Sequence, residues 1–255
     1  MNEQHESTRL SYSSAEALES RAELFRLLKD YPGVEEETER SLGLFLRASL
    51  LARIFGIREL YEEIVMLPGI VVDLGTWRGQ TAVLCENLRA IFEPLHFNRR
   101  IVCFDTFAGY RGFSEKDRPT DLHQDGTYDV GQGYAGLLER LLILHEQGNA
   151  MGHNYGKHRV IAGDCRTTVP QFFEQHPNEI VALAFFDLNC YEPTRTSLET
   201  VFQRLVPGGI IAFWQLTRDA IAAEGTVYAN EVLNRHAHRL QRSRFYPGLC
   251  YLKKT

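Results

Sequence analysis

Residues 69–81 constrain the fold of this chain more than any other stretch. They read Gly-Ile-Val-Val-Asp-Leu-Gly-Thr-Trp-Arg-Gly-Gln-Thr. The apolar run at 70–74 predicts a buried strand, the glycines Gly75 and Gly79 predict a tight turn, and 81–91 is compatible with a helix. A strand, a glycine turn and a helix in this order indicate an α/β sheet with a ligand of nucleotide type at the turn. The spacing G-x-x-x-G also fits a plain βα turn.

From Gly69 onward, short apolar runs alternate with helical stretches. Strands are predicted at 70–74, 100–104, 158–162, 180–186 and 209–214, and helices at 81–91, 135–146, 168–174, 193–205 and 227–236. A final pair of runs, 237–245 and 249–253, predicts a β-hairpin. This alternation predicts a Rossmann-like α/β fold, with a mostly parallel sheet and helices on both of its faces.

The sequence before Gly69 predicts helices only. Residues 1–14 are polar and are expected to be disordered. We interpret 15–68 as a helical cap and 69–255 as the ligand-binding domain. Within 15–68, helices are predicted at 15–28, 36–55 and 57–66. Because these helices have apolar faces, a homodimer is one expectation for this chain.

One long segment, 108–133, lacks the periodicity of a helix or strand. It contains glycines, charges and the aromatic side chains of Tyr110, Phe113 and Tyr128, and Tyr134 follows it directly. Loops of this length inside a compact domain are usually functional or disordered. We interpret it as a lid-like loop over an acceptor site, and a disordered insertion is the alternative.

Composition excludes several classes of function. The formal net charge is -5, so no broad basic surface for nucleic acid is expected. No run is apolar and long enough to suggest a membrane span, and no apolar leader opens the chain. The cysteines are Cys85, Cys103, Cys165, Cys190 and Cys250, none of them in a C-x-x-C pattern. We therefore expect no zinc site and reduced thiols in a cytoplasmic protein.

Acidic residues stand at the ends of three further predicted strands. Asp105 is placed to accept the hydroxyls of a ribose, although it could also cap a turn. Asp164 is placed near an adenine amino group, or it simply begins a turn. Asp187 follows Phe185 and Phe186, and burial against these rings is expected to raise its pKa toward that of a useful base.

Taken in order, these segments resemble one known family. They are Val-Asp-Leu-Gly-Thr-Trp-Arg-Gly at 72–79, Phe-Asp-Thr-Phe-Ala-Gly at 104–109, Gly-Asp at 163–164, Asp-Leu-Asn-Cys-Tyr-Glu-Pro-Thr at 187–194 and Leu-Val-Pro-Gly-Gly at 205–209. The acid and G-x-x-x-G loop resemble motif I of class I S-adenosylmethionine-dependent methyltransferases. The whole series is similar to the macrocin O-methyltransferase (TylF-like) family, which methylates sugar hydroxyls in the biosynthesis of antibiotics and other natural products.

The resemblance implies a seven-stranded sheet, S-adenosylmethionine as cofactor and a small-molecule acceptor. It implies that Gly75, Thr76 and Trp77 wrap the methionine part, that Asp105 holds the ribose and that Asp164 lies beside the adenine. Asp187 is implied as a magnesium ligand and as the base. The full expected cofactor set is Asp73, Gly75, Thr76, Trp77, Gly79, Asp105, Thr106, Phe107, Asp164 and Asp187.

The fifth predicted strand departs from that family. The family has two adjacent aspartates at its end, where this chain has Trp214 and Gln215. A hard cation needs several oxygen ligands, so we expect no magnesium site, with Asp187 as a ligand only if a metal is retained. Proton removal then falls to Asp187, or to His123 or His153 from segments that could cover the site.

Other functions remain open at this stage. A protein with this cofactor site could transfer the methyl group to nitrogen, sulfur or carbon, or bind the cofactor without transferring a methyl group. A catalytically silent scaffold is a further alternative. A nicotinamide dehydrogenase fits least, because the glycine spacing is not G-x-G-x-x-G.

Overall fold

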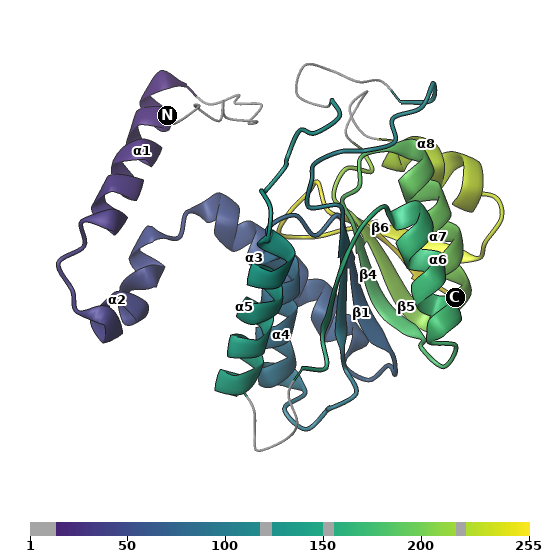
Figure 1. Ribbon diagram of the computed structural model, residues 1–255, viewed down its shortest axis with the longest axis horizontal. Coiled ribbons are helices and arrows are strands. Elements are labelled where there is room, and N and C mark those ends of the chain that lie inside the picture. The colour runs from purple at the N-terminus through teal and green to yellow at the C-terminus, as the bar shows by residue number, and fades with distance from the viewer. Residues whose placement is uncertain (1–13, 118–123, 150–155, 218–222) are drawn as a thin grey trace. The chain divides into compact units, whose positions relative to one another are not determined.

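The computed structural model describes residues 14–117, 124–149, 156–217 and 223–255 (Figure 1). The chain divides into two compact units, Met1–Arg53 and Ile54–Thr255. The first unit contains α1 (Ala15–Lys29), α2 (Glu35–Ser41), a 3-10 helix (Leu42–Phe45) and the first residues of α3 (Ala48–Ile64). None of its first three helices has a buried side chain. The Tyr31 hydroxyl donates to Ser41 Oγ at 2.8 Å and the Tyr31 ring meets Phe45 edge-on.

The predicted helices at 36–55 and 57–66 are wrong in their boundaries. The first is interrupted after Phe45, and α3 runs without a break through the predicted gap near Gly56. Gly56 is buried, and a Cβ there would lie 3.2 Å from Leu249 Cδ2 and 3.3 Å from Ser243 Oγ. The glycine therefore permits close packing against the C-terminal hairpin, a contact that local sequence does not reveal.

The second unit is built on a single seven-stranded sheet in the order β3-β2-β1-β4-β5-β7-β6. The strands are β1 (Ile70–Leu74), β2 (Ile101–Asp105), β3 (Arg159–Ala162), β4 (Val181–Phe186), β5 (Leu205–Phe213), β6 (His238–Arg242) and β7 (Cys250–Lys254). Strands β1 to β5 pair in parallel, and β7 pairs antiparallel with both β5 and β6. This topology confirms the predicted Rossmann-like α/β fold with its terminal hairpin.

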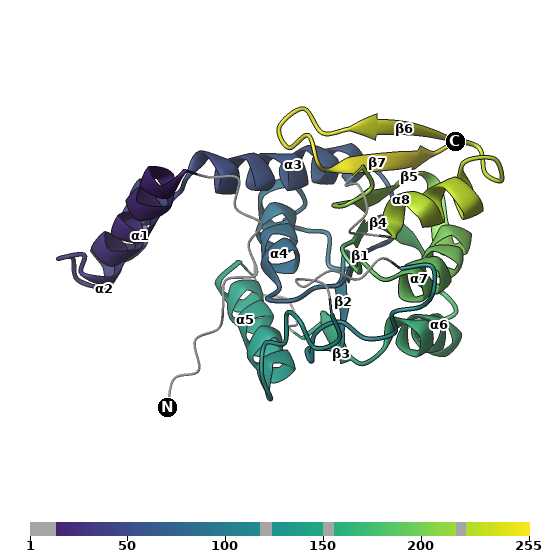
Figure 2. The same ribbon diagram turned by 90° about the horizontal axis from the view of Figure 1, so that it is seen from above.

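Helices cover both faces of the sheet (Figures 1 and 2). They are α4 (Gln80–Phe92), α5 (Tyr134–Asn149), α6 (Cys165–Gln175), α7 (Tyr191–Arg204) and the short α8 (Glu224–Val227), which continues as a π-helical turn (Tyr228–Val232). Figure 2 shows α4 and α5 on one side of the strands and α6, α7 and α8 on the other. Among the described residues, no helix has the combination of length and apolarity that crossing a bilayer requires.

Strand β4 shows why its sequence is apolar without alternation. All its residues are buried. Leu183 and Phe185 belong to the core under α4 and α5, whereas Ala184 and Phe186 belong to the core under α6 and α7. A strand that packs on both faces needs apolar residues at every position, which is the pattern that the sequence displays.

The parallel strands end together at one edge of the sheet. Leu74 is in register with both Phe104 and Phe186, Asp105 with Ala162, and Phe186 with Phe213. The sheet hydrogen bonds continue one residue further at this carboxyl edge, because Gly75 N–H donates to Phe104 O at 2.9 Å and Asp187 N–H to Leu74 O at 2.9 Å. The loops that follow these strands are therefore held side by side.

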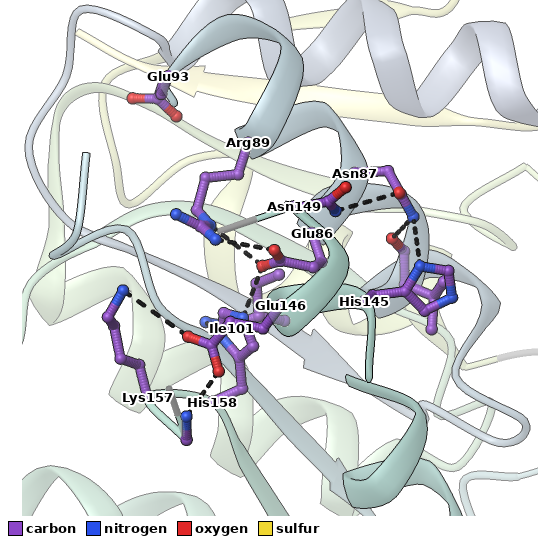
Figure 3. Close-up of polar contacts among 12 residues, drawn as sticks. Glu86, Asn87, Arg89, Glu93, Ile101, His145, Glu146, Asn149, Lys157 and His158 are labelled. Carbon is purple, nitrogen blue, oxygen red and sulfur yellow. Dashed lines mark hydrogen bonds and ion pairs between the residues drawn. The ribbon is translucent and has the colours of Figure 1, made fainter. Parts of the chain in front are cut away.

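A buried polar cluster lies elsewhere, under α4 and α5 (Figure 3). Glu86 accepts hydrogen bonds from Arg89 at 2.7 and 3.0 Å and contacts His158 Nε2 at 2.6 Å. The main-chain N–H of Ile101 donates to His158 Nδ1 at 3.0 Å, which leaves the proton on Nε2 to donate to Glu86. Burial alone would raise the pKa of Glu86, but His158 and Arg89 lower it to about 2. Ile101 begins β2, so this cluster is at the opposite end of the strand from the carboxyl edge.

Candidate active site at the carboxyl edge of the sheet

The loop after β1 begins with a close approach between main chains. Gly75 has φ +76°, and a Cβ on it would lie 2.3 Å from the carbonyl oxygen of Asp187. Only glycine satisfies both conditions without a shift of the backbone. The space beside Gly75 is thus filled by the chain after β4. Thr76, which follows, is buried and donates its hydroxyl to Asp73 O at 2.8 Å, so only its main chain faces the loop.

Trp77 and Arg78 are the exposed residues of this loop, and Trp77 carries its aromatic ring. Its side chain is 41% exposed, its ring meets Tyr128 edge-on at 5.7 Å, and the Arg78 guanidinium lies over it at 4.9 Å. The Trp77 N–H donates to Asp105 Oδ2 at 2.7 Å, which ties the loop after β1 to the end of β2. Gly79, the last residue of the loop, is the N-cap of α4 and contributes no side-chain hydrogen bond there.

Asp105 connects two loops through its carboxylate. Its Oδ2 accepts from Trp77 N–H and its Oδ1 accepts from Phe107 N–H, each at 2.7 Å. Burial raises the pKa of Asp105, although these N–H groups oppose the shift. A carboxylate offers about four acceptor sites, so each oxygen keeps capacity for a further donor such as a ribose hydroxyl. Thr106 donates its hydroxyl to Gly109 O at 2.6 Å, and the ring of Phe107 is buried.

Asp164 has a local partner. It is the N-cap of α6, and its Oδ1 accepts from Arg166 N–H at 2.9 Å. The Arg166 guanidinium also contacts it, with Nε 2.9 Å from Oδ2. Burial alone would raise the pKa of Asp164, but the hydrogen bonds from Arg166 lower it. Asp164 therefore stands at the expected strand end, and its carboxylate is already paired with the Arg166 guanidinium.

Asp187 follows β4 directly beside the Gly75 loop. Its Oδ1 lies 3.4 Å from Nε2 of Gln215. Gln215 is in the loop after β5, and its side chain faces Asp187. The preceding residue, Trp214, points away from this site, because its ring is 5% exposed and stacks on Phe185 with centroids 6.2 Å apart. The end of β5 thus presents an amide to Asp187, and the indole belongs to the core.

The described parts of 108–133 contact this edge. The Tyr110 hydroxyl accepts from Asn189 Nδ2 at 2.6 Å, and Asp117 Oδ1 accepts from Tyr191 N–H at 2.7 Å. The rings of Tyr110 and Tyr128 meet edge-on at 5.2 Å. Burial, with the charge of Asp187 as the next cause, raises the pKa of Tyr110, so it stays a neutral phenol.

Backbone strain concentrates at the same edge. Among the described residues, four that are not glycine have positive φ: Trp77, Phe107, Tyr128 and Asn189. They follow β1, β2 and β4 or lie in 124–133, the part of the long loop that contacts them. Such conformations cost of order 1–3 kcal/mol each and cluster at functional sites. Trp77, Phe107 and Tyr128 were named from the sequence for other reasons. Of the four residues, only Asn189 has a sequence signal for this backbone region, because asparagine tolerates it.

Glu224 is a site residue that the sequence analysis missed. It is fully buried, and its Oε2 accepts from Gln215 N–H at 2.8 Å. Burial, with the charge of Asp187 as the next cause, raises the pKa of Glu224 well above its usual value. Its neighbours in sequence form no strand and no recognisable motif, so only tertiary structure brings it to Asp187.

Two histidines were predicted as alternative catalytic bases. His123 and His153 both lie outside the described residues. His145 is described, and its Nδ1 contacts Asn87 Nδ2 at 3.2 Å on the α4–α5 side. Of the predicted residues that are described, the structure gathers Gly75, Thr76, Trp77, Gly79, Asp105, Thr106, Phe107, Asp164 and Asp187 in loops at the carboxyl edge, and Asp73 lies within β1. In the part of the chain that the structure describes, no group of three or more His, Cys, Asp or Glu could hold a metal ion.

Comparisons with known proteins agree with this geometry. A family model described as "Methyltransferase domain" matches residues 72–213. A crystal structure of CalS11, a calicheamicin methyltransferase, is 32% identical with a TM-score of 0.88, covering 95% of this chain and 94% of that chain. An apo structure of CalS11, named there as a TDP-rhamnose 3'-O-methyltransferase, is 30% identical with a TM-score of 0.81, covering 95% and 96%.

A structure with lower sequence identity has a similar fold. The O-methyltransferase NovP is 19% identical with a TM-score of 0.60, covering 80% of each chain. A search of curated proteins found no match. The matched region runs from β1 to β5 and so contains the loops that carry Gly75, Asp105 and Asp187. The chain belongs to the methyltransferase domain family and is a class I S-adenosylmethionine-dependent methyltransferase.

Proposed function

We propose that this protein methylates a hydroxyl group of a small molecule, a sugar or glycoside, in natural-product tailoring. The observation that carries this proposal is the likeness along nearly the whole chain to a TDP-rhamnose 3'-O-methyltransferase, at 30% identity over 95% of this chain. We take the sugar part of a nucleotide sugar as the first acceptor class to test. The alternatives are transfer to nitrogen, sulfur or carbon, and a silent scaffold.

S-adenosylmethionine, when bound, supplies a methyl group on a positively charged sulfur. The residues at the carboxyl edge fit this cofactor, because the Asp105 carboxylate is fixed by two N–H donors and keeps acceptor capacity for ribose hydroxyls. The main chain of the Gly75 loop and the exposed ring of Trp77 would border the methionine part. Asp164, with Arg166, would stand beside the adenine, while Asp73, Gly79, Thr106 and Phe107 shape the loops.

Asp187 is the base in this proposal. The Asp187 carboxylate would accept the proton of the acceptor hydroxyl, whose oxygen would take the methyl group from the sulfur of S-adenosylmethionine. The sheet bond from Asp187 N–H to Leu74 O holds the residue beside the Gly75 loop. Aligning the acceptor with the methyl group is the larger part of the catalytic task, because the sulfonium already activates the methyl carbon.

The aromatic side chains of the long loop would bind the acceptor. Trp77, Tyr128 and Tyr110 form a chain of edge-on contacts across the site, at 5.7 and 5.2 Å. Aromatic rings with polar edges suit the apolar faces and hydroxyls of a sugar and exclude water from the reacting atoms. His123 and His153 remain alternative bases within this proposal.

We also propose that the reaction needs no magnesium ion and takes place in the cytoplasm, in a homodimer. The amide of Gln215 faces Asp187 where a cation would need oxygen ligands. All five cysteines are free and buried, as expected in a reducing compartment. The exposed apolar side chains of the first unit, including Phe25 and Leu44, support self-association.

The experiment is a product assay with S-adenosylmethionine and a panel of acceptors beginning with TDP-rhamnose. We expect a product heavier by one methyl group, release of S-adenosylhomocysteine, and loss of both in Asp187→Asn without loss of S-adenosylhomocysteine binding. A methylated nitrogen, sulfur or carbon in the product would assign the alternative reaction. Binding without any methylated product across nucleotide sugars and glycosides would count against the proposal.

A further inference from the structure

The main chain at Gln215 is fixed from two sides. The preceding N–H, of Trp214, donates to Phe186 O at 3.1 Å and extends the pairing of β4 with β5 by one residue. The Gln215 N–H itself leaves the sheet and donates to Glu224 Oε2 at 2.8 Å. Because Glu224 is fully buried, this acceptor cannot exchange its bond for one with water.

The segment that carries Glu224 is tied to the loop after β4 as well. Ala223 N–H donates to Asn189 O at 3.1 Å, and Asn189 in turn bonds to the Tyr110 hydroxyl. The loops after β4 and β5 and the start of α8 therefore form one hydrogen-bonded unit around Asp187. The main chain of Gln215 is therefore held at a fixed position relative to the Asp187 carboxylate.

From this position the Gln215 side chain extends toward Asp187. Its Nε2 lies 3.4 Å from Asp187 Oδ1. A carboxylate only accepts hydrogen bonds, so the amide must present its NH₂ group and not its oxygen. A divalent cation on the same carboxylate oxygen would have to replace these hydrogens with oxygen ligands. While the amide donates to Asp187, it offers no oxygen ligand to a cation at this position.

The neighbouring groups lack the two adjacent aspartates that the sequence resemblance implies beside Asp187, because Trp214 and Gln215 take their places. The Trp214 ring is in the core, 5% exposed, and meets Tyr246 edge-on at 5.5 Å. Glu224 Oε2 is engaged by Gln215 N–H, whereas Glu224 Oε1 and Asn189 Oδ1 are buried without a hydrogen-bond partner among the described residues. Within the described ranges, no acidic, histidine or cysteine cluster completes a coordination shell. The magnesium site implied by the sequence resemblance does not fit the residues at this edge.

We propose that Gln215 is a positioning residue that orients the Asp187 carboxylate for a metal-free proton transfer. This inference rests on the proposed function and assigns to the Gln215 amide the orienting task that a cation would otherwise perform. Glu224 holds the main chain from which that amide projects. The inference predicts that the protein neither binds nor needs a divalent cation at Asp187.

The first test is a titration of the full-length protein, saturated with S-adenosylhomocysteine, with Mn²⁺ followed by electron paramagnetic resonance. We expect the signal of free Mn²⁺ throughout, in both the wild type and Asp187→Asn. Stoichiometric Mn²⁺ binding in the wild type that Asp187→Asn abolishes would overturn the inference. This readout needs no acceptor, so it decides the question even if the proposed methylation fails.

The second test compares Gln215→Ala with Gln241→Ala, a matched change on the exposed face of β6. With the acceptor that the product assay identifies, and with EDTA present, we expect kcat of Gln215→Ala to fall about 10- to 100-fold. The KM for S-adenosylmethionine and the affinity for S-adenosylhomocysteine should match those of the Gln241→Ala control. An unchanged kcat, or a wild-type enzyme that EDTA inactivates and Mn²⁺ restores, would overturn the positioning role.

Discussion

At the scale of single residues, the candidate site depends on a main-chain approach at Gly75. The chain after β4 occupies the position of a side chain, since a Cβ would lie 2.3 Å from Asp187 O. The same approach sets the distance between the loop that would hold the cofactor and the proposed base. A substitution at Gly75 therefore acts on stability and on binding together.

Gly75→Ala should lower the free energy of unfolding by roughly 2–4 kcal/mol, from the left-handed φ and the displaced main chain. The control is Gly131→Ala, where φ is +89° and a Cβ meets nothing within 4 Å, with an expected cost of about 1 kcal/mol. Urea unfolding measures both, and calorimetry should show that only Gly75→Ala weakens S-adenosylhomocysteine binding. Equal losses of unfolding free energy in the two variants would show that the close contact between Gly75 and Asp187 O adds nothing to the cost of the substitution.

Glu224 gives a prediction with a definite pH dependence. Because burial and the charge of Asp187 raise its pKa in the folded protein, Glu224 stabilises the fold below its ordinary pKa and loses that contribution as pH rises. Glu224→Gln keeps an acceptor oxygen for Gln215 N–H and does not titrate. We expect its stability relative to wild type to increase between pH 5 and pH 8, measured by urea midpoints. A relative stability that stays constant over this range would mean that Glu224 is already ionised in the folded protein and would contradict a raised pKa.

Single residues also show what the sequence can and cannot predict of the site. Asp105 and Asp187 were predictable because an acid that ends an apolar strand must lie at the carboxyl edge. Glu224 was not, because its burial beside Asp187 depends on tertiary contacts such as the hydrogen bond from Gln215 N–H. Tyr128 was named as part of a lid-like loop, but its edge-on contact with Trp77 required the structure. For Gln215 the departure from the family was visible, but its hydrogen bond to Asp187 required the structure.

At the scale of elements, the strands were predicted better than the helices before them. Strand β1 was predicted with its observed bounds because a buried parallel strand is a nearly continuous apolar run, interrupted here only by Asp73. Strand β5 begins earlier than predicted, at Leu205, because Pro207 and the following glycines resemble a turn. The structure accommodates them by a register shift against β4, between the pairs of Val181 and Leu183.

The buried Glu86 cluster predicts an effect on stability without an effect on binding. His158→Ala removes a hydrogen bond to Glu86 and one from Ile101 N–H, and should cost about 2–4 kcal/mol of unfolding free energy. Since the cluster lies at the amino end of β2, S-adenosylhomocysteine affinity measured by calorimetry should be unchanged. A large loss of affinity in a variant that remains folded would contradict this separation.

The same cluster sets an acid limit on stability. The pKa of Glu86 is lowered from 4.5 to about 2, so its contribution is present above 4.5 and is lost as pH falls toward 2. In His158→Ala the main cause of the lowering is gone. Thermal unfolding of the variant should therefore depend less on pH than that of wild type over this range, and an equal dependence would assign the acid sensitivity to other groups.

At the scale of the whole molecule, the two units differ in how they bury apolar residues. The sheet of the second unit has a core on each face, whereas α1, α2 and the 3-10 helix of the first bury none of their side chains. Exposed apolar residues of the first unit are Leu18, Phe25, Leu27, Val34, Leu42, Leu44 and Leu46. A segment of this kind is stabilised when a partner covers it.

We therefore expect the full chain to be a dimer at micromolar concentration. The double variant Phe25→Asp, Leu44→Asp should become monomeric in size-exclusion chromatography with light scattering, and should still bind S-adenosylhomocysteine. Leu95→Asp is the matched control, because Leu95 is 68% exposed and lies in the second unit. A wild type that stays monomeric at all concentrations would refute the expected dimer.

The most direct measurement is a calorimetric titration of the purified protein with S-adenosylhomocysteine, with and without EDTA, beside Asp105→Ala. Saturable binding by the wild type that ignores EDTA, and its loss in a folded Asp105→Ala variant, is the expected result. Asp105 accepts hydrogen bonds from the loops after β1 and β2, so Asp105→Ala removes both the proposed ribose acceptor and the link between these loops. Absence of binding by the wild type, or full affinity in Asp105→Ala, would contradict a cofactor site at the carboxyl edge.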